Sequence, residues 1–406
     1  MDTQNTPIHI KLWHHDFWRL CFANLLLMMS VYMLLPALPH YMMHEGYDAL
    51  HIASAMGAYG LGIFLLGPFC SYWVQRYRRN HVCQLAIAGV VASILVIYYL
   101  EVFTQVAIEY WMIICARLVL GACLGLAQMA LGSTLIIDTC ESFQRTEANY
   151  ITSWFSRFAL ALGPIVSISV IDFWGVQIAF PVAAITAIVS LALMSLVKFP
   201  FKAPADHMCK LSLDRFLLPQ GFPLFINIVL STMVVGMFLA HPHSLQFFMM
   251  VLAGLVLAVI AEKYVFADAD LKSEVITGLL LIGAALLITL SHQSMAVEFI
   301  VPCMIGLGLG IIGSRFLLFY IKLAKHCQRG TSMSSFFLAW EFGLSLGLYL
   351  GFLLMDESYI RSIIHQFEFL DLVDITLVNT GLGLVIFGLL IYNFAVHPWY
   401  MKHRNR

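Results

Sequence analysis

The chain has 406 residues, of which 61% are hydrophobic and only 11% are Asp, Glu, Lys or Arg. Soluble domains carry about 25% charged residues, so this chain has too few charges to cover a water-exposed surface, and we expect lipid to cover most of it. The net charge of −1 and the lack of a basic block with interleaved aromatic residues argue against nucleic-acid binding. The nine cysteines form no C-x-x-C pair, which predicts neither a metal site nor a disulfide framework.

A helix that crosses the hydrocarbon core of a membrane needs about 20 mostly apolar residues. The first such segment follows a polar stretch over residues 1–12, and it is too long for the core of a cleaved signal peptide. In chain order, we expect membrane-spanning helices near residues 16–37, 51–74, 81–101, 109–137, 145–171, 175–198, 222–241, 244–266, 273–292, 296–324, 332–355 and 375–396. The chain is therefore predicted to be an all-α polytopic membrane protein.

Lysine and arginine gather in alternate connections between these segments. Cytoplasmic loops of membrane proteins carry most of these residues, so the connections that contain Arg76, Arg145 and Arg329 are predicted to face the cytoplasm. Of the lysines and arginines, only Arg361 falls in the connections on the other side. This alternation predicts an even number of spans, with both termini in the cytoplasm.

The longest predicted cytoplasmic connection divides the chain into two halves. We expect one six-helix bundle over residues 1–199, a cytoplasmic linker over 200–221 and a second six-helix bundle over 222–406. No connection is long enough to hold a soluble catalytic domain, so the sequence favours a transporter over an enzyme.

A weak internal repeat relates the two halves. Gln144-Arg145 follows the fourth predicted span and Gln328-Arg329 follows the tenth, at a separation of 184 residues. Each pair stands at the cytoplasmic end of a glycine-rich segment and begins another span. Duplicated six-helix halves are typical of secondary transporters.

With these features, the chain resembles the major facilitator superfamily over nearly its whole length. The fourth span carries Arg117-x-x-x-Gly121-x-x-x-Gly125, which is similar to the Arg–Gly motif on the fourth helix of proton-coupled exporters in that family. Gly163-Pro164 on the fifth span resembles the Gly-Pro of the family's antiporter motif. The resemblance implies two pseudo-symmetric bundles that surround a central solute site.

The cytoplasmic connections of the family supply a second point of comparison. The segment from Asp138 to Arg145 resembles the Asp…Arg turn between the fourth and fifth helices. Between the second and third helices the family usually has Asp-Arg-x-Gly-Arg, but Gln75 replaces the acid here. The resemblance therefore implies a gating motif at the cytoplasmic end without that acid, formed by Arg76, Arg79, Asp138, Arg145 and Arg329.

Two ionisable residues fall deep within predicted spans, where such groups usually face a partner or an aqueous path. Arg117 lies roughly 12 Å from the outer face, at a rise of 1.5 Å for each residue after Glu109. It is a candidate for a substrate or proton-relay charge, and the alternative is a structural arginine bonded to backbone carbonyls. Glu341 lies roughly 18 Å from the inner face, counted from Arg329. It is our candidate for proton coupling, and the alternative is a neutral, hydrogen-bonded structural glutamate.

Two further arginines lie within spans. A shift of 184 residues places Arg157 on Glu341, and we hypothesise that these two residues form an ion pair in one access state and separate in another. Alternatively, the long side chain of Arg157 extends to the cytoplasmic interface. Arg315 lies late on the tenth span, and we expect its side chain to extend to the inner surface.

Aromatic and amide side chains supply weaker candidates for the solute site. Trp154 and Trp340 lie next to Arg157 and Glu341, where they could stack on an apolar or cationic solute or simply pack between helices. Asn24, Gln128 and Asn227 are candidates for polar contacts with a solute.

Glycines form regular patterns on the later spans. Gly343 and Gly347 recur at an interval of four residues, which predicts close helix packing. The G-x-G-x-x-G pattern at Gly308, Gly310 and Gly313 lies inside an apolar span and lacks the preceding strand that a dinucleotide site requires.

These observations predict a secondary transporter whose two halves rock around a central site. The chain has no nucleotide-binding motif, so the expected energy source is a proton gradient, and no cofactor is expected. The favoured function is proton-coupled export of small organic compounds. Uptake of a sugar or an organic acid and a membrane-embedded enzyme for lipid-linked substrates remain alternatives. We expect a monomer that contacts only its solute and the lipid bilayer, in a bacterial inner membrane.

Overall fold

The computed structural model describes residues 12–104, 109–141, 143–199, 209–267, 269–290, 295–325, 328–355 and 375–404. Every regular element in these ranges is helical. The first half contains α1 (His15–Tyr32), α2 (Leu34–His44), α3 (Ala49–Leu65), α4 (Gly67–Arg76), α5 (Arg79–Thr104), α6 (Tyr110–Ala130), η1 (Leu131–Leu135), α7 (Ile136–Asp138), α8 (Arg145–Trp174) and α9 (Val176–Ser195). The second half contains η2 (Pro219–Gly221), α10 (Phe222–Leu239), α11 (Leu245–Tyr264), α12 (Leu271–Thr289), η3 (Ala296–Ile300), α13 (Val301–Leu323), α14 (Arg329–Leu354), α16 (Ile375–Ile391), η5 (Tyr392–Val396) and α17 (His397–His403).

The helices give the expected number of membrane crossings. In the described ranges, 11 helical segments are long and apolar enough to span a membrane, and α3 and α4, bent by 44° at their junction, make a twelfth. Helices α1 and α2 together form the first crossing, and α6, η1 and α7 form the fourth. The prediction of an all-α protein with twelve spans is confirmed. The loop that contains Arg361 and residues 200–208 of the predicted linker lie outside the described residues.

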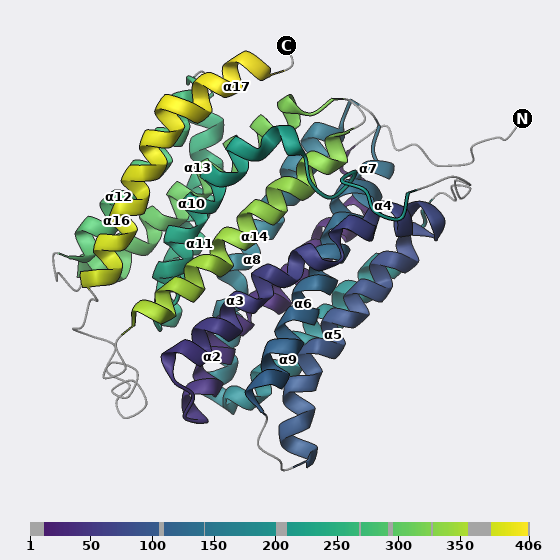
Figure 1. Ribbon diagram of the computed structural model, residues 1–406, viewed down its shortest axis with the longest axis vertical. Coiled ribbons are helices and arrows are strands. Elements are labelled where there is room, and N and C mark those ends of the chain that lie inside the picture. Colours follow the sequence, from purple (N-terminus) through teal and green to yellow (C-terminus); the bar gives the residue numbers. More distant parts are fainter. Residues whose placement is uncertain are drawn as a thin grey trace, which may run out of the picture.

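The two halves of the chain lie side by side (Figure 1). In the first half, α1 packs on α8 and α9, and α3 and α5 pack on α6. In the second half, α10 packs on α14, and α13 packs on α11 and α12. The halves meet chiefly where α3 contacts α14 and where α8 contacts α11. The boundaries of the two bundles at residues 199 and 222 stay predictions.

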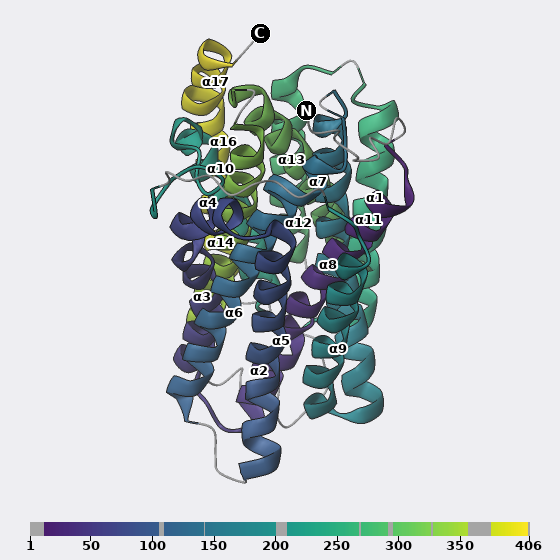
Figure 2. The same cartoon turned by 90° about the vertical axis from the view of Figure 1, so that its right-hand side faces the viewer.

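One end of the bundle carries most of the basic residues. Helices α4, α7 and α17 lie toward this end, whereas α2 lies toward the other (Figures 1 and 2). We call the first the basic end; Arg76, Arg79, Arg145, Arg215 and Arg329 lie in or beside its connections. The other is called the opposite end. The prediction that the basic end faces the cytoplasm stays a prediction.

At the opposite end, helix-capping residues and a glycine mark the turns between successive spans. The Asp48 side chain caps α3 by accepting a hydrogen bond of 2.9 Å from the backbone N–H of His51, as short polar residues do at helix N-termini. Ser244 caps α11 in the same way. Gly175 alone joins α8 to α9 at a φ of 89°, a conformation that costs glycine little.

Glycines set the distances between the helices that carry the central residues. Gly121 and Gly125 of α6 face the backbone of α3, and a Cβ atom on Gly121 would lie 3.0 Å from the Cα of Gly62. Gly343 and Gly347 of α14 face α10 in the same manner. Gly163, which precedes Pro164 within α8, lets α1 approach so closely that a Cβ there would lie 2.8 Å from the Cβ of Tyr32. Small residues permit such contacts between membrane helices.

The first prediction concerns this packing. Gly121→Ala places a methyl group against the backbone of α3, so we expect the folded state to lose about 1–3 kcal/mol, the usual cost of overpacking. Gly383→Ala on α16 is the matched control, because no atom lies within 4 Å of its added Cβ. Thermal unfolding of the purified protein in detergent should show a lower midpoint for the first variant only. Equal midpoints would contradict the close contact between α3 and α6.

Candidate functional site

A single carboxyl group joins the two halves near the centre of the bundle. Glu341 lies on α14 of the second half and its residue is only 1% exposed. The hydroxyl group of Tyr59 on α3 donates a hydrogen bond of 2.7 Å to Oε2 of Glu341. The hydroxyl group of Tyr32 on α1 donates another to Oε1. Both donors belong to the first half of the chain, so these hydrogen bonds connect the carboxyl group of the second half to the first half.

Arg117 of α6 lies behind Tyr59. It is 2% exposed, its Nε donates a hydrogen bond of 3.2 Å to the carbonyl oxygen of Ala55, and its guanidinium carbon lies 5.1 Å from the ring centroid of Tyr59. Among the described residues, none accepts a hydrogen bond from Nη1. Arg117 and Glu341 line one cavity of about 20 Å³, which is large enough for a single water molecule.

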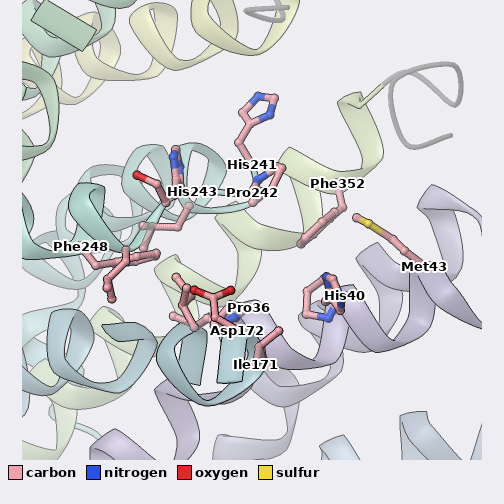
Figure 3. Close-up of a pocket in the computed structure, with 17 residues that line it drawn as sticks. Pro36, His40, Met43, Ile171, Asp172, His241, Pro242, His243, Phe248 and Phe352 are labelled. Carbon is pink, nitrogen blue, oxygen red and sulfur yellow. The ribbon is translucent and has the colours of Figure 1, made fainter. Parts of the chain in front are cut away.

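A larger cavity of about 230 Å³ lies at the opposite end (Figure 3). Leu35 of α2 and Leu239 of α10 line both this cavity and the small central one. A third cavity, of about 20 Å³, shares Tyr32 and Glu341 with the central one and continues toward Arg157. The three cavities therefore form a series from the opposite end to the level of Arg157, with Glu341 near its middle.

The large cavity has a mostly apolar wall with imidazole groups. Pro36, Phe248 and Phe352 are among its apolar residues, while His40 and Asp172 lie together on one side (Figure 3). His243 also lines it and donates a hydrogen bond of 2.8 Å from Nε2 to the carbonyl oxygen of Phe238. Burial lowers the pKa of His243 to about 3, so its ring is neutral at physiological pH. In the described residues, no group of three His, Cys, Asp or Glu side chains could hold a metal ion.

The basic end is closed by polar contacts between α8, α11 and α13. Arg157 is 3% exposed, and its Nη1 donates hydrogen bonds to the carbonyl oxygen of Gly310 at 2.8 Å and to Oγ of Ser314 at 3.0 Å. Glu262 of α11 accepts hydrogen bonds from the hydroxyl groups of Ser314 and Tyr150. Because Tyr150 and Arg157 belong to the first half, this cluster connects the halves.

Arg157 and Glu341 both line the third cavity but do not form an ion pair in this state. Among the described ion pairs there is none between these two side chains, and both side chains have other partners. The side chain of Arg157 does not extend to the aqueous interface either, because it is buried and donates to Gly310 and Ser314 of α13. Exchange of partners between access states stays a hypothesis.

The expectation for Arg315 is wrong. Its side chain does not extend to the inner surface but forms a bidentate ion pair with Glu274 of α12, with Nε 2.6 Å from Oε2. Glu274 is fully buried. A bidentate pair of arginine with a carboxylate combines two charge-assisted hydrogen bonds, which are stronger than hydrogen bonds between neutral groups. Only the position of Glu274 in the first turn of the ninth span could have signalled this pair.

The linker supplies an acid that the sequence comparison did not find. Asp214 accepts hydrogen bonds from the hydroxyl groups of Ser71 on α4, at 3.3 Å, and Thr331 on α14, at 3.1 Å. The backbone N–H of Leu218 donates to Oγ of Ser335 at 2.7 Å. The described part of the linker therefore connects the two halves at the basic end. Gln75, at the position where the family usually has an acid, donates a hydrogen bond of 2.9 Å from its amide to Oγ of Ser71.

The predicted gating residues lie around this closure. Arg79 forms an ion pair with Asp138, within the first half. Arg76 ends α4 and is exposed, Arg145 begins α8, and Arg329 begins α14. Among the five predicted gating residues, the described ion pair is that of Arg79 with Asp138.

The amide candidates have different positions. Asn24 accepts a hydrogen bond of 2.8 Å from Gln128 and donates one of 2.7 Å to Ser156, and Gln128 lines the third cavity. Asn227 donates to the carbonyl oxygen of Gly388 at 3.0 Å. That bond joins α10 to α16 within the second half, so the structure does not bring Asn227 to the central residues.

The tryptophan candidates pack against the glycines of α13. The guanidinium carbon of Arg157 lies 3.8 Å from the ring centroid of Trp154, and a Cβ atom on Gly310 would lie 3.2 Å from that ring. Trp340 lines the third cavity, and a Cβ atom on Gly313 would lie 2.9 Å from it. The glycine pattern of α13 therefore makes room for aromatic side chains and not for a nucleotide.

Comparison with known proteins identifies the family. The model of the Major Facilitator Superfamily matches residues 20–348. The chain belongs to the major facilitator superfamily. No curated protein matches the sequence of this facilitator. The family assignment and the architecture make it a membrane transporter rather than an enzyme.

Solved structures share the fold of this facilitator at low sequence identity. A peptide transporter in complex with alafosfalin is 12% identical, with a TM-score of 0.66 and coverage of 96% of both chains. A nucleoside transporter is 11% identical, with a TM-score of 0.64 over 93% of this chain and 100% of its own. A bacterial homologue of the iron transporter ferroportin, in an outward-facing state, is 14% identical, with a TM-score of 0.62 over 96% of this chain and 100% of its own.

The second prediction tests the closure of the basic end. Spin labels on α8 and α11, at the exposed residues Glu147 and Lys263, report the separation of the halves by double electron–electron resonance. Glu262→Gln removes the negative charge that strengthens the hydrogen bonds between the halves. We therefore expect an additional population of molecules in which the two spin labels lie farther apart. Glu274→Gln is the control, since the Glu274 ion pair lies within one half. An unchanged distance distribution in Glu262→Gln would contradict the gating role.

Proposed function

We propose that this facilitator is a proton-coupled secondary transporter of a small organic solute and that Glu341 is its proton site. The observation that supports this proposal is the position of the Glu341 carboxyl group, which receives hydroxyl hydrogen bonds from α1 and α3 of the other half. A change in its protonation changes the contact between the halves. A buried carboxyl group in a membrane protein commonly marks an ion or proton path.

Access to the site supports alternating access as the mechanism. The series of cavities reaches Glu341 from the opposite end, while Glu262, Asp214 and their partners close the basic end. Because cytoplasmic loops are rich in Lys and Arg, we assign the basic end to the cytoplasm. The described state then faces outward, and the central cavity would have to widen before a solute could occupy it. A monomer in a bacterial inner membrane fits this arrangement.

Export in exchange for protons is the first candidate for the direction of transport. The likeness of the Arg117–Gly121–Gly125 sequence to the motif of proton-coupled exporters supports it. In this mechanism, solute and proton bind alternately, and binding of one releases the other.

Uptake together with protons is the second candidate. It is supported by the guanidinium group of Arg117, which lines the same cavity as Glu341 and has a donor without a partner among the described residues. A solute attracted by that cation would occupy the site together with a protonated Glu341.

The third prediction measures coupling and direction together. Proteoliposomes that contain a fluorescent pH reporter receive solutes from outside, drawn from lipophilic cations, sugars, amino acids and organic acids. Uptake with protons acidifies the interior, whereas exchange makes it more alkaline. We expect a solute-dependent pH change with wild type. With Glu341→Gln the rate should be at least about 100-fold smaller, because loss of a positioned proton-transfer group costs roughly 100-fold to 10,000-fold.

The control variant is Glu45→Gln, which neutralises an exposed carboxylate beyond α2 and should leave the pH change intact. Liposomes without protein correct for passive permeation of weak acids and bases. A pH change of equal rate in Glu341→Gln would contradict its role as the proton site. The absence of any pH change during measured solute transport would contradict proton coupling.

A further inference from the structure

The three arginines within the membrane differ in how their charges are satisfied. Arg157 donates to the carbonyl oxygen of Gly310 and to two serine hydroxyl groups. Arg315 has the carboxylate of Glu274. Arg117 has one carbonyl oxygen and the face of a tyrosine ring, and among the described residues it has no acidic partner in an ion pair.

The surroundings of Arg117 make this difference significant. A guanidinium group carries five N–H donors, and for Arg117 the described structure gives one hydrogen bond, from Nε. Its Nη1 is buried and has no partner among the residues that the structure describes. Burial of a cation without a counter-charge or full hydrogen bonding costs several kcal/mol. The sequence retains this cost at a position where methionine or leucine would fit a membrane span. A retained cost of this kind indicates a functional role for the charge, such as binding a group from outside the chain.

The position of Arg117 indicates what that partner is. The side chain lines the cavity that also contains Glu341, and Leu35 and Leu239 separate this cavity from the larger one at the opposite end. A guanidinium group binds the two oxygens of a planar oxyanion with paired hydrogen bonds. A molecule that enters from the opposite end therefore meets an unsatisfied oxyanion-binding group after it passes the two leucines.

We propose that Arg117 binds the oxyanion group of the transported solute, for which a carboxylate is the simplest case. This inference rests on the proposed function, because it names the solute class of that same site. The larger cavity, with Pro36, Phe248 and Phe352 in its wall, takes the apolar part of the solute. Its one carboxylate belongs to Asp172, which is exposed, so water and salt screen its repulsion of an anion.

Binding of an anion has a consequence for coupling. An anion at Arg117 repels an ionised carboxylate in the same cavity, so it favours the protonated form of Glu341. Anion and proton then bind together, and the site operates as a co-transporter. The assignment of Arg117 therefore favours uptake over exchange.

The fourth prediction uses three probes with one apolar scaffold, namely 3-phenylpropionate, 3-phenylpropionamide and 3-phenylpropylamine. Thermal unfolding of the purified full-length protein is measured with each probe. A ligand that binds only the folded state raises the midpoint, so we expect a rise with the carboxylate but not with the amide or the amine. Arg117→Met should abolish the rise. Arg117→Lys should weaken binding by about tenfold, because an ammonium group cannot pair with both oxygens.

The unliganded variants provide a readout that does not depend on the choice of probe. Arg117→Met removes an incompletely satisfied charge, so it should unfold at the same temperature as wild type or higher. Arg157→Met is the matched control and should unfold at a lower temperature, because it leaves Ser314 and the carbonyl oxygen of Gly310 without their donor. A lower midpoint for Arg117→Met would show that the protein already satisfies the guanidinium group, for instance through a water molecule that bridges to Glu341, and would overturn the proposal.

The proposal is also overturned if the carboxylate protects wild type no better than the amide and the amine, or protects Arg117→Met equally. This failure is distinguishable from failure of the proposed function. Proton flux driven by a sugar or a cation, without carboxylate binding, would remove the anion assignment and leave the transporter assignment intact. Carboxylate binding without any proton flux would leave the anion assignment intact and remove proton coupling from the proposed function.

Discussion

The structure depends on a carboxyl group that is buried where the two halves meet. Burial of Glu341 would be costly without hydrogen-bond donors, and Tyr32 and Tyr59 provide them only if α1 and α3 lie close to α14. Glycines allow this proximity: Gly163 lets α1 approach α8, and the pairing of Gly62 with Gly121 lets α3 approach α6. The residues that pack the helices therefore also determine the geometry of the candidate proton site.

The two ends of the molecule differ in how they are held. At the basic end, the halves are joined by hydroxyl, carboxylate and guanidinium groups, including Glu262 with Tyr150 and Asp214 with Thr331. At the opposite end, a largely apolar cavity lies between the helices that meet there. Polar contacts of this kind can be exchanged for contacts with water, which suits an end that has to open during transport. The tight contact between α3 and α14 can remain through such a motion.

Hydropathy was sufficient to predict the spans and their number, because the requirement for about 20 apolar residues is a local property of the chain. The family was predicted from the two six-helix halves together with short motifs such as Arg117-x-x-x-Gly121. The depths of Arg117 and Glu341 also followed from helical rise alone. Partners could not be predicted in the same way, because they depend on the rotation of each helix about its axis and on which helices become neighbours. Arg315 is an example: its neighbour Glu274 lies 41 residues earlier and no periodicity connects them. The pseudo-symmetry that related Arg157 to Glu341 fixed their equivalent positions but not a contact between them. Asp214 lies in a linker, where sequence gives no indication of docking.

The most direct test of the central role of Glu341 is a measurement of the opposite end as a function of pH. Spin labels replace Phe173 on α8 and Met249 on α11, both exposed, in a protein whose native cysteines have been substituted and which is embedded in lipid nanodiscs. If protonation of Glu341 shifts the balance of access states, the distance distribution of wild type changes between acidic and alkaline buffer, and that of Glu341→Gln does not. A full pH response in Glu341→Gln would contradict the account, because another group would then control the motion of the halves.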